Sequence, residues 1–230
     1  MTIFVIIAIV IVVGVVLFFV IRGGVDTGRI PAQLEPVYSY YFECIKDETN
    51  RALSIAGSQG GRIDVGEYVP GSEYAPFSNQ LNFLGFPVPY WYYVSGNGVI
   101  KENVPSKGDV EGEIEKYLEE SLVNCNFNSF YEQGFDIEFD EPSVDVKVND
   151  GGVDVNVQSA LIVKRGEENA RKSSHSVSVS SEFGEFYNLA REIYDKEKTD
   201  SFLEVYGVDV LMLYSPVDGV EIQCAPKVWR

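Results

Sequence analysis

The pattern of hydrophobic and polar positions divides this 230-residue chain into a wholly apolar start and a mixed remainder. Residues 3–21, IFVIIAIVIVVGVVLFFVI, contain no charged residue and no proline. As a helix this segment is about 30 Å long, which matches the hydrocarbon core of a bilayer. Arg22 and two glycines end it. We therefore predict a hydrophobic anchor or assembly helix over residues 1–24 and a short linker over residues 25–35.

The apolar run differs from a cleaved secretory signal. A signal peptide has a basic region before a shorter apolar stretch and a small-residue cleavage site after it, and neither feature flanks residues 3–21. We expect the anchor to be retained. The residues expected to contact lipid, or copies of the same segment, are Ile3, Phe4, Ile7, Ile11, Gly14 and Phe18.

Beyond the linker, apolar residues recur at helical spacing in three segments. The first predicted helix runs from Pro36 to Gly57, the second begins with Asp109 as its cap, and the third covers residues 183–194. The apolar faces of the first two helices consist of Val37, Tyr41, Cys44, Ile45, Ala52 and Ile55, and of Val110, Ile114, Tyr117, Leu118, Leu122 and Cys125.

Between the second and third helices the apolar period changes to two, which is typical of strands with one buried face. The polar residues 165–174 are expected to form a loop, and strands at 208–214 and 220–224 a final hairpin. The alternating segments of the predicted meander are residues 135–139, 144–148, 153–157 and 161–163, followed by Val177 and Val179.

Proline, glycine and aromatic residues dominate residues 62–108, which we predict to be a loop with one hairpin. Pro87 and Pro89 confine the aromatic run to an edge strand or a bulged strand, and Gly96-Asn97-Gly98 supplies the turn. These aromatic side chains either contact a protein partner or pack over the core beneath a long loop. The candidate contact residues are Tyr90, Trp91, Tyr92 and Tyr93.

The predicted order of elements is helix, hairpin, helix, meander, helix, hairpin. The chain lacks the strand–helix–strand repeat that indicates a parallel sheet. We therefore predict an α+β fold class, with an antiparallel sheet and about three helices. Residues 36–230 are long enough for one ordinary domain.

Charge excludes one class of partner. The chain has 35 acidic and 18 basic residues and a formal net charge of -17. Such a surface repels phosphate backbones and anionic lipid headgroups, so we expect no binding to nucleic acid.

Three cysteines, Cys44, Cys125 and Cys224, are too far apart for a C-x-x-C metal or redox motif. One disulfide among them would suit an oxidising cell exterior, and all three pairings are open. Cys44 with Cys125 is favoured because both lie on apolar faces of predicted helices, and reduced buried thiols are the alternative.

The sequence offers little catalytic chemistry, and we predict a protein that is not an enzyme and has no cofactor. The serines around His175 lack a G-x-S-x-G elbow, and His175 is expected at an exposed loop edge. Asp136 and Glu138 share the solvated face of a strand rather than forming a glycosidase pair. No phosphate-binding glycine loop opens a helix.

Orientation in a membrane is ambiguous by charge alone. Arg22 and Arg29 follow the apolar run, which favours a cytoplasmic C-terminal side. The length of the downstream domain weakens such a count, and its acidic, Tyr-rich character favours the cell exterior. We expect a membrane-anchored protein with most of the chain outside the cell.

The opening segment Thr2–Val10, TIFVIIAIV, resembles the mature N-terminus of archaeal type IV pilin-like proteins. In that family a leader is removed by a dedicated peptidase, and the apolar helix first anchors the subunit in the membrane and later packs into the filament core. Two positions depart from the pattern: Met1 stands where glutamine is frequent, and Val5 where bacterial pilins carry an acidic residue.

Two hypotheses follow. The first is a structural cell-surface protein, a pilin-like filament subunit that assembles through residues 3–21. The second is a single-pass membrane-anchored surface protein that does not polymerise and binds a protein partner through its aromatic hairpin. The expected partners are membrane lipid, copies of the chain, or that protein.

Overall fold

The structure is a computed structural model that describes residues 30–71, 73, 78–94 and 98–213. These residues form an α+β fold with five helices and antiparallel sheets. The predicted anchor over residues 1–24 and the predicted strand 220–224 lie outside them. The chain divides into two units, residues 1–184 and 185–230, which are described separately.

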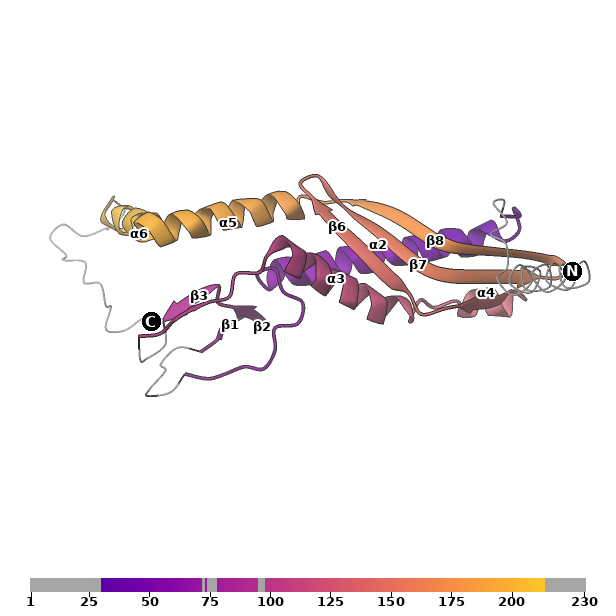
Figure 1. The fold of residues 1–230 in the computed structure, drawn as a ribbon, viewed down its shortest axis with the longest axis horizontal. Coiled ribbons are helices and arrows are strands. Elements are labelled where there is room, and N and C mark those ends of the chain that lie inside the picture. The colour runs from indigo at the N-terminus through magenta and orange to yellow at the C-terminus, as the bar shows by residue number, and fades with distance from the viewer. Residues whose placement is uncertain (1–29, 72, 74–77, 95–97, 214–230) are drawn as a thin grey trace, which may run out of the picture. The chain divides into compact units, whose positions relative to one another are not determined.

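A four-stranded antiparallel sheet is the centre of the first unit (Figure 1). Its strands are β5 (Asp136–Phe139), β6 (Ser143–Asn149), β7 (Gly152–Arg165) and β8 (Glu168–Ser180). The long strand β7 pairs with β8 on one side, and with β6 and then β5 along the other. The predicted antiparallel sheet is therefore confirmed, but it is not a simple meander, because β5 pairs with β7 and not with the next strand, β6.

The predicted loop over residues 165–174 is wrong, because β8 already begins at Glu168. A tight turn at Gly166, with φ of 62°, brings this polar segment directly against β7. Pairing continues down to Glu168 opposite Arg165, and Ala170 is buried opposite Val163. Hydrogen bonds to β7 thus hold the first half of β8 as a strand, although its side chains do not alternate between apolar and polar.

Two long helices cover the sheet core. Helix α2 (Glu35–Ser58) matches the first predicted helix to within one residue at each end. It packs against β8, and its Tyr38 hydroxyl donates to the Leu161 carbonyl of β7 at 3.3 Å. Helix α3 (Lys107–Leu122) packs on α2 and on β6, and the short helix α4 (Asn128–Glu132) follows it. The predicted apolar face of α3 is largely buried, through Val110, Ile114, Leu118 and Leu122.

Helix α3 begins with a capping box. The N-cap is Ser106, whose hydroxyl accepts from the Asp109 backbone N–H at 3.1 Å. The Asp109 carboxylate in turn accepts from the Ser106 N–H at 2.8 Å. The prediction that Asp109 is itself the cap is therefore wrong: it is the third helical residue and completes the box from inside.

The described residues between α2 and α3 form two hairpins, rather than the one predicted. They are β1 (Gln80–Phe83) with β2 (Phe86–Pro89), and β3 (Tyr92–Val94) with β4 (Ile100–Glu102). In a two-stranded hairpin each strand is an edge, so Pro87 and Pro89 are tolerated in β2. The unpredicted turn is Leu84-Gly85, where both residues have positive φ.

The second unit is helical where it is described. Helix α5 (Phe183–Asp200) begins in the first unit and confirms the third predicted helix, and α6 (Phe202–Leu213) follows. The predicted strand over residues 208–214 is wrong, because this short alternating run continues a helix that starts at Phe202. None of the helices in the described ranges is long and apolar enough to cross a membrane.

We expect Ser106→Ala to lower the free energy of unfolding by about 1 kcal/mol at neutral pH, because the α3 cap is lost. Hydrogen bonds from Ser106 hold the pKa of the Asp109 carboxyl below its usual value. In the unfolded chain this carboxyl is therefore protonated at a higher pH than in the folded protein, and the part of the stabilisation that the carboxylate supplies is lost as pH falls from about 4 through the lowered pKa. Urea unfolding at neutral and acidic pH should show the wild type and the variant converging in acid. A constant difference across that range would contradict the linkage to Asp109.

Candidate functional site

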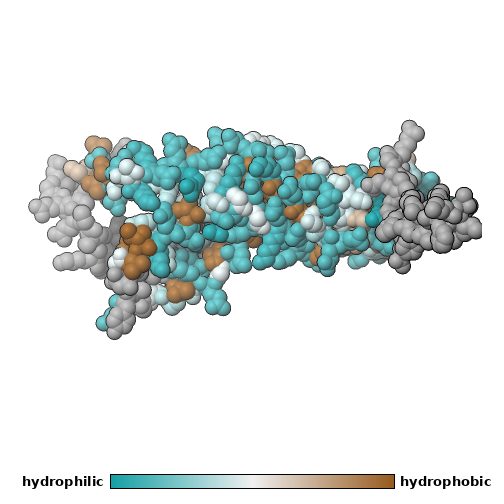
Figure 2. Space-filling view, in the orientation of Figure 1, coloured by the Kyte–Doolittle hydropathy of each residue, from teal (hydrophilic) through white to brown (hydrophobic). Residues whose placement is uncertain are grey.

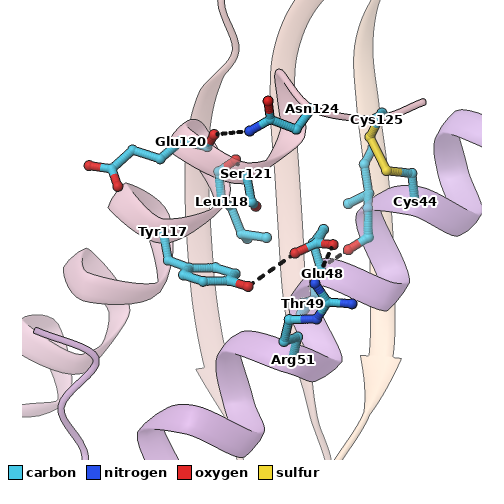
Figure 3. The surroundings of a disulfide bond; sticks show 11 residues. Cys44, Glu48, Thr49, Arg51, Tyr117, Leu118, Glu120, Ser121, Asn124 and Cys125 are labelled. Atoms are coloured by element: carbon cyan, nitrogen blue, oxygen red, sulfur yellow. Dashed lines mark hydrogen bonds and ion pairs between the residues drawn. A yellow bond between two sulfur atoms is a disulfide. The ribbon is translucent and has the colours of Figure 1, made fainter. Parts of the chain in front are cut away.

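A disulfide joins helix α2 to the residues that follow α3 in the first unit (Figure 3). It links Cys44 of α2 to Cys125, three residues after α3, across 81 residues of sequence. The favoured pairing is thus confirmed. Cys224, the third cysteine, lies outside the described residues.

Polar contacts beside the disulfide join helices α2 and α3 (Figure 3). The Tyr117 hydroxyl of α3 donates to the Glu48 carboxylate of α2 at 3.1 Å, and Arg51 lies 3.4 Å from the same carboxylate. Burial, and then the Glu48 carboxylate, raise the pKa of Tyr117. Tyr117 therefore remains a neutral donor, and the cluster has a structural role.

Three glutamates of α3 bind the outer edge of strand β6. Glu119, Glu115 and Glu111 are spaced by four residues, and their carboxylates accept from the backbone N–H groups of alternate β6 residues. The bonds are Val144 N–H to Glu119 at 3.0 Å, Val146 N–H to Glu115 at 3.0 Å and Val148 N–H to Glu111 at 2.9 Å. Helix α3 thus supplies the acceptors that a neighbouring strand would otherwise provide.

A fourth glutamate holds the chain that follows α2. The Glu113 carboxylate pairs with the Arg62 guanidinium at 2.9 Å and accepts from the backbone N–H groups of Ile63 and Asp64. Arg62 also donates to the Asn103 side chain at 3.2 Å. These contacts fix the base of the hairpin region against α3.

Most of the aromatic candidates are anchored rather than free. The Trp91 indole N–H donates to the Gly60 carbonyl at 2.8 Å, and Trp91 is half-buried. Tyr90 and Tyr93 are half-buried with ring centroids 6.4 Å apart. Tyr92 is the exposed member, with 41% of its surface accessible. The run therefore mainly attaches the hairpins to the end of α2.

The other hairpin, β1–β2, carries several exposed apolar side chains. Leu84, at the β1–β2 turn, is 84% exposed, and Phe83 beside it is 59% exposed. Figure 2 shows such hydrophobic patches as separate areas on a mostly hydrophilic face. Sequence reasoning missed this tip, although the apolar run Leu81–Phe86 around Gly85 could have indicated it. Its exposed apolar residues are Leu81, Phe83, Leu84 and Phe86.

His175 is fully buried, so the prediction of an exposed loop edge is wrong. It lies in β8 on the face towards α2, with its ring 4.9 Å from Tyr41 and 5.8 Å from Phe42. Its Nε2 atom is 3.1 Å from the Ser159 carbonyl, in the stretch where the β7–β8 register shifts. Burial raises the pKa of the adjacent Tyr41. This is a core histidine between aromatic rings.

Asp136 and Glu138 are both exposed on the same side of β5 and pair with one lysine. The Lys164 ammonium of β7 is 2.9 Å from Glu138 and 3.8 Å from Asp136, and the Glu138 carboxylate raises its pKa. Over the described ranges, no group of three or more His, Cys, Asp or Glu side chains could hold a metal ion. The candidate assembly residues within 3–21 lie outside those ranges.

Comparison with known proteins finds no matching family model, no matching curated protein and no matching solved structure.

We expect Glu115→Ala to accelerate hydrogen exchange at Val146, because its N–H loses a charged acceptor. The loss should lower the free energy of unfolding by about 1–2 kcal/mol. Glu115→Gln keeps a carbonyl acceptor and should retain most of the protection. Glu120→Ala, at an exposed position of the same helix, is the matched control. Equal exchange of β6 in all three variants, measured by mass spectrometry, would show that these contacts do not hold the strand.

Proposed function

We propose that the protein is a structural protein of the cell surface, anchored through residues 3–21, which also assemble it into a pilin-like filament. The observation that supports an exterior location best is the Cys44–Cys125 disulfide. Such bonds persist in oxidising compartments and are rare in reducing ones. The acidic charge of the chain is consistent with a solvated exterior domain.

The position of α2 supports a mechanical link between the apolar segment and the domain. Only the short linker separates the segment from α2, which begins at Glu35. The first turns of α2 are deeply buried: Val37, Tyr38, Tyr41 and Ile45 each expose 2% or less. A load that reaches the start of α2 would therefore pass into the sheet core through packed side chains.

The filament interface would be the apolar segment itself. Packing residues 3–21 against their copies replaces contact with lipid by contact with protein, and Gly14 allows close approach of helices. The N-terminal resemblance to archaeal type IV pilin-like proteins supports the same arrangement. Membrane lipid is then the partner before assembly, and other copies of the chain are the partner after it.

We expect Val12→Asp to abolish filament assembly, because an unpaired carboxylate is costly inside an apolar bundle. Val12→Leu keeps the apolar character and should assemble normally. The measurement is electron microscopy of material sheared from cells, with mass spectrometry of the released protein and its N-terminus. Normal filaments from the aspartate variant, or recovery of the wild type only in the membrane pellet, would overturn the filament proposal.

A second candidate function is binding of a protein partner by the β1–β2 hairpin. The observation that favours it is the exposed apolar tip at Phe83 and Leu84. An exposed apolar patch of this kind is typical of an interaction surface. The hairpin contact would not need residues 3–21 to polymerise.

We expect Leu84→Asp to reduce partner recovery without unfolding the domain. Leu84 has a φ of 52°, a conformation that aspartate tolerates better than leucine, so the change should not strain the turn. Val123→Asp, at an exposed position after α3, is the matched control. Trp91→Ala is less suitable because it also removes the bond to Gly60. Equal recovery of cross-linked partners from cells carrying wild type and Leu84→Asp would contradict this candidate.

A further inference from the structure

The two edges of the four-stranded sheet differ in their protection. Along β6, the three α3 glutamates accept from the outward N–H groups of Val144, Val146 and Val148. Along β8, no hydrogen bond from the described part of the chain reaches the outer side of residues 174–180. One edge is closed by a helix, and the other is open.

The pairing register identifies the open groups. Because Val144, Val146 and Val148 direct their N–H groups away from β7, their partners on β7 bond instead to β8. Those partners face His175, Val177 and Val179, which therefore complete the β7–β8 ladder. The alternate residues of β8 carry N–H and C=O groups that point away from the sheet. They are Ser174, Ser176, Ser178 and Ser180.

This open stretch lacks the usual devices that prevent edge pairing. Residues 173–180, SSHSVSVS, contain no Lys, Arg, Asp, Glu or Pro. The serine hydroxyls lean towards β7: Ser176 donates to Asn156 at 3.2 Å and Ser178 donates to Asp154 at 2.8 Å. Small side chains held over the sheet leave the backbone edge accessible to another strand.

Helix α5 begins next to the β6–β7 turn. Gly184, in its first turn, packs against the Asn149 carbonyl in the β6–β7 turn, so closely that a Cβ there would clash. Phe183 approaches Gly57 at the end of α2. After Ser180 the chain therefore turns towards β6 and away from the open edge of β8.

We propose that the open edge of β8 pairs antiparallel with the same edge of a second copy of this chain. Pairing centred on Val177 would place Ser176 of each copy opposite Ser178 of the other, and join the two sheets through backbone hydrogen bonds.

The net charge favours a second copy at this site over approach elsewhere. With a net charge of -17, two copies repel each other over most of their surfaces. The segment 173–180 is uncharged apart from the buried His175, so this edge meets its own copy without that penalty. The contact goes beyond the proposed function, because it does not use residues 3–21.

The test is native mass spectrometry of the full chain in nonionic detergent. We expect dimers for the wild type, and at least a tenfold weaker dimer for Ser178→Lys, which places like charges beside the two-fold axis. Ser176→Pro should also dissociate the dimer, since it removes an outward N–H while leaving the β7 ladder intact. Ser129→Lys, at an exposed position in α4, is the matched control and should remain dimeric.

Folding of each variant is checked by circular dichroism and by retention of the Cys44–Cys125 disulfide. Slow hydrogen exchange of β8 in the wild type and fast exchange in Ser178→Lys would support the contact further. A monomeric wild type overturns the proposal. So does a dimer that survives Ser178→Lys and Ser176→Pro but dissociates with Val12→Asp, because that dimer is held by residues 3–21. Loss of filaments in Val12→Asp, with the detergent dimer intact, leaves both contacts separately established.

Discussion

The alignment of α3 with the edge of β6 determines most of the first unit. Four residues of a helix advance about 6.0 Å and two residues of a strand about 6.6 Å, so glutamates four apart meet alternate N–H groups nearly in step. The small mismatch accumulates slowly enough for three successive bonds, from Glu111, Glu115 and Glu119. The neighbouring face of the same helix, one residue earlier in each turn, carries leucine, isoleucine and valine against α2. One helix therefore seals a sheet edge and completes the core.

Helix α3 is also fixed at both ends, which maintains this alignment. The capping box at Ser106 and the Glu113 contacts with Arg62 hold its beginning, and the disulfide at Cys125 holds the residues after its end. The Glu113 contacts position the hairpin region at the same time. The loop after α2, the hairpins and the sheet edge thus depend on a single helix, and a change in its register would displace all three.

Sequence patterns predicted the elements whose own side chains decide their structure. Helix α2 and the strands with alternating valines were found because each has one buried face. The first half of β8 was missed because polar residues from Glu168 onwards are held by pairing with β7, which a local pattern does not reveal. The run at 208–213 alternates like a strand, yet the helix that starts at Phe202 includes it. His175 was misplaced because burial between Tyr41 and Phe42 depends on α2, far away in the sequence.

Charge explains why the contrast between the two sheet edges matters. The acidic residues of two copies repel each other. At physiological ionic strength this repulsion is largely screened when the charges are more than about 8 Å apart. Short-range backbone pairing can therefore compete only where no carboxylate faces another carboxylate. The β6 edge fails this condition because glutamates line it, whereas the serines of β8 meet it. The same acidic residues that keep the surface solvated thus restrict where two copies can approach, and the uncharged edge of β8 remains a place for directional hydrogen bonding.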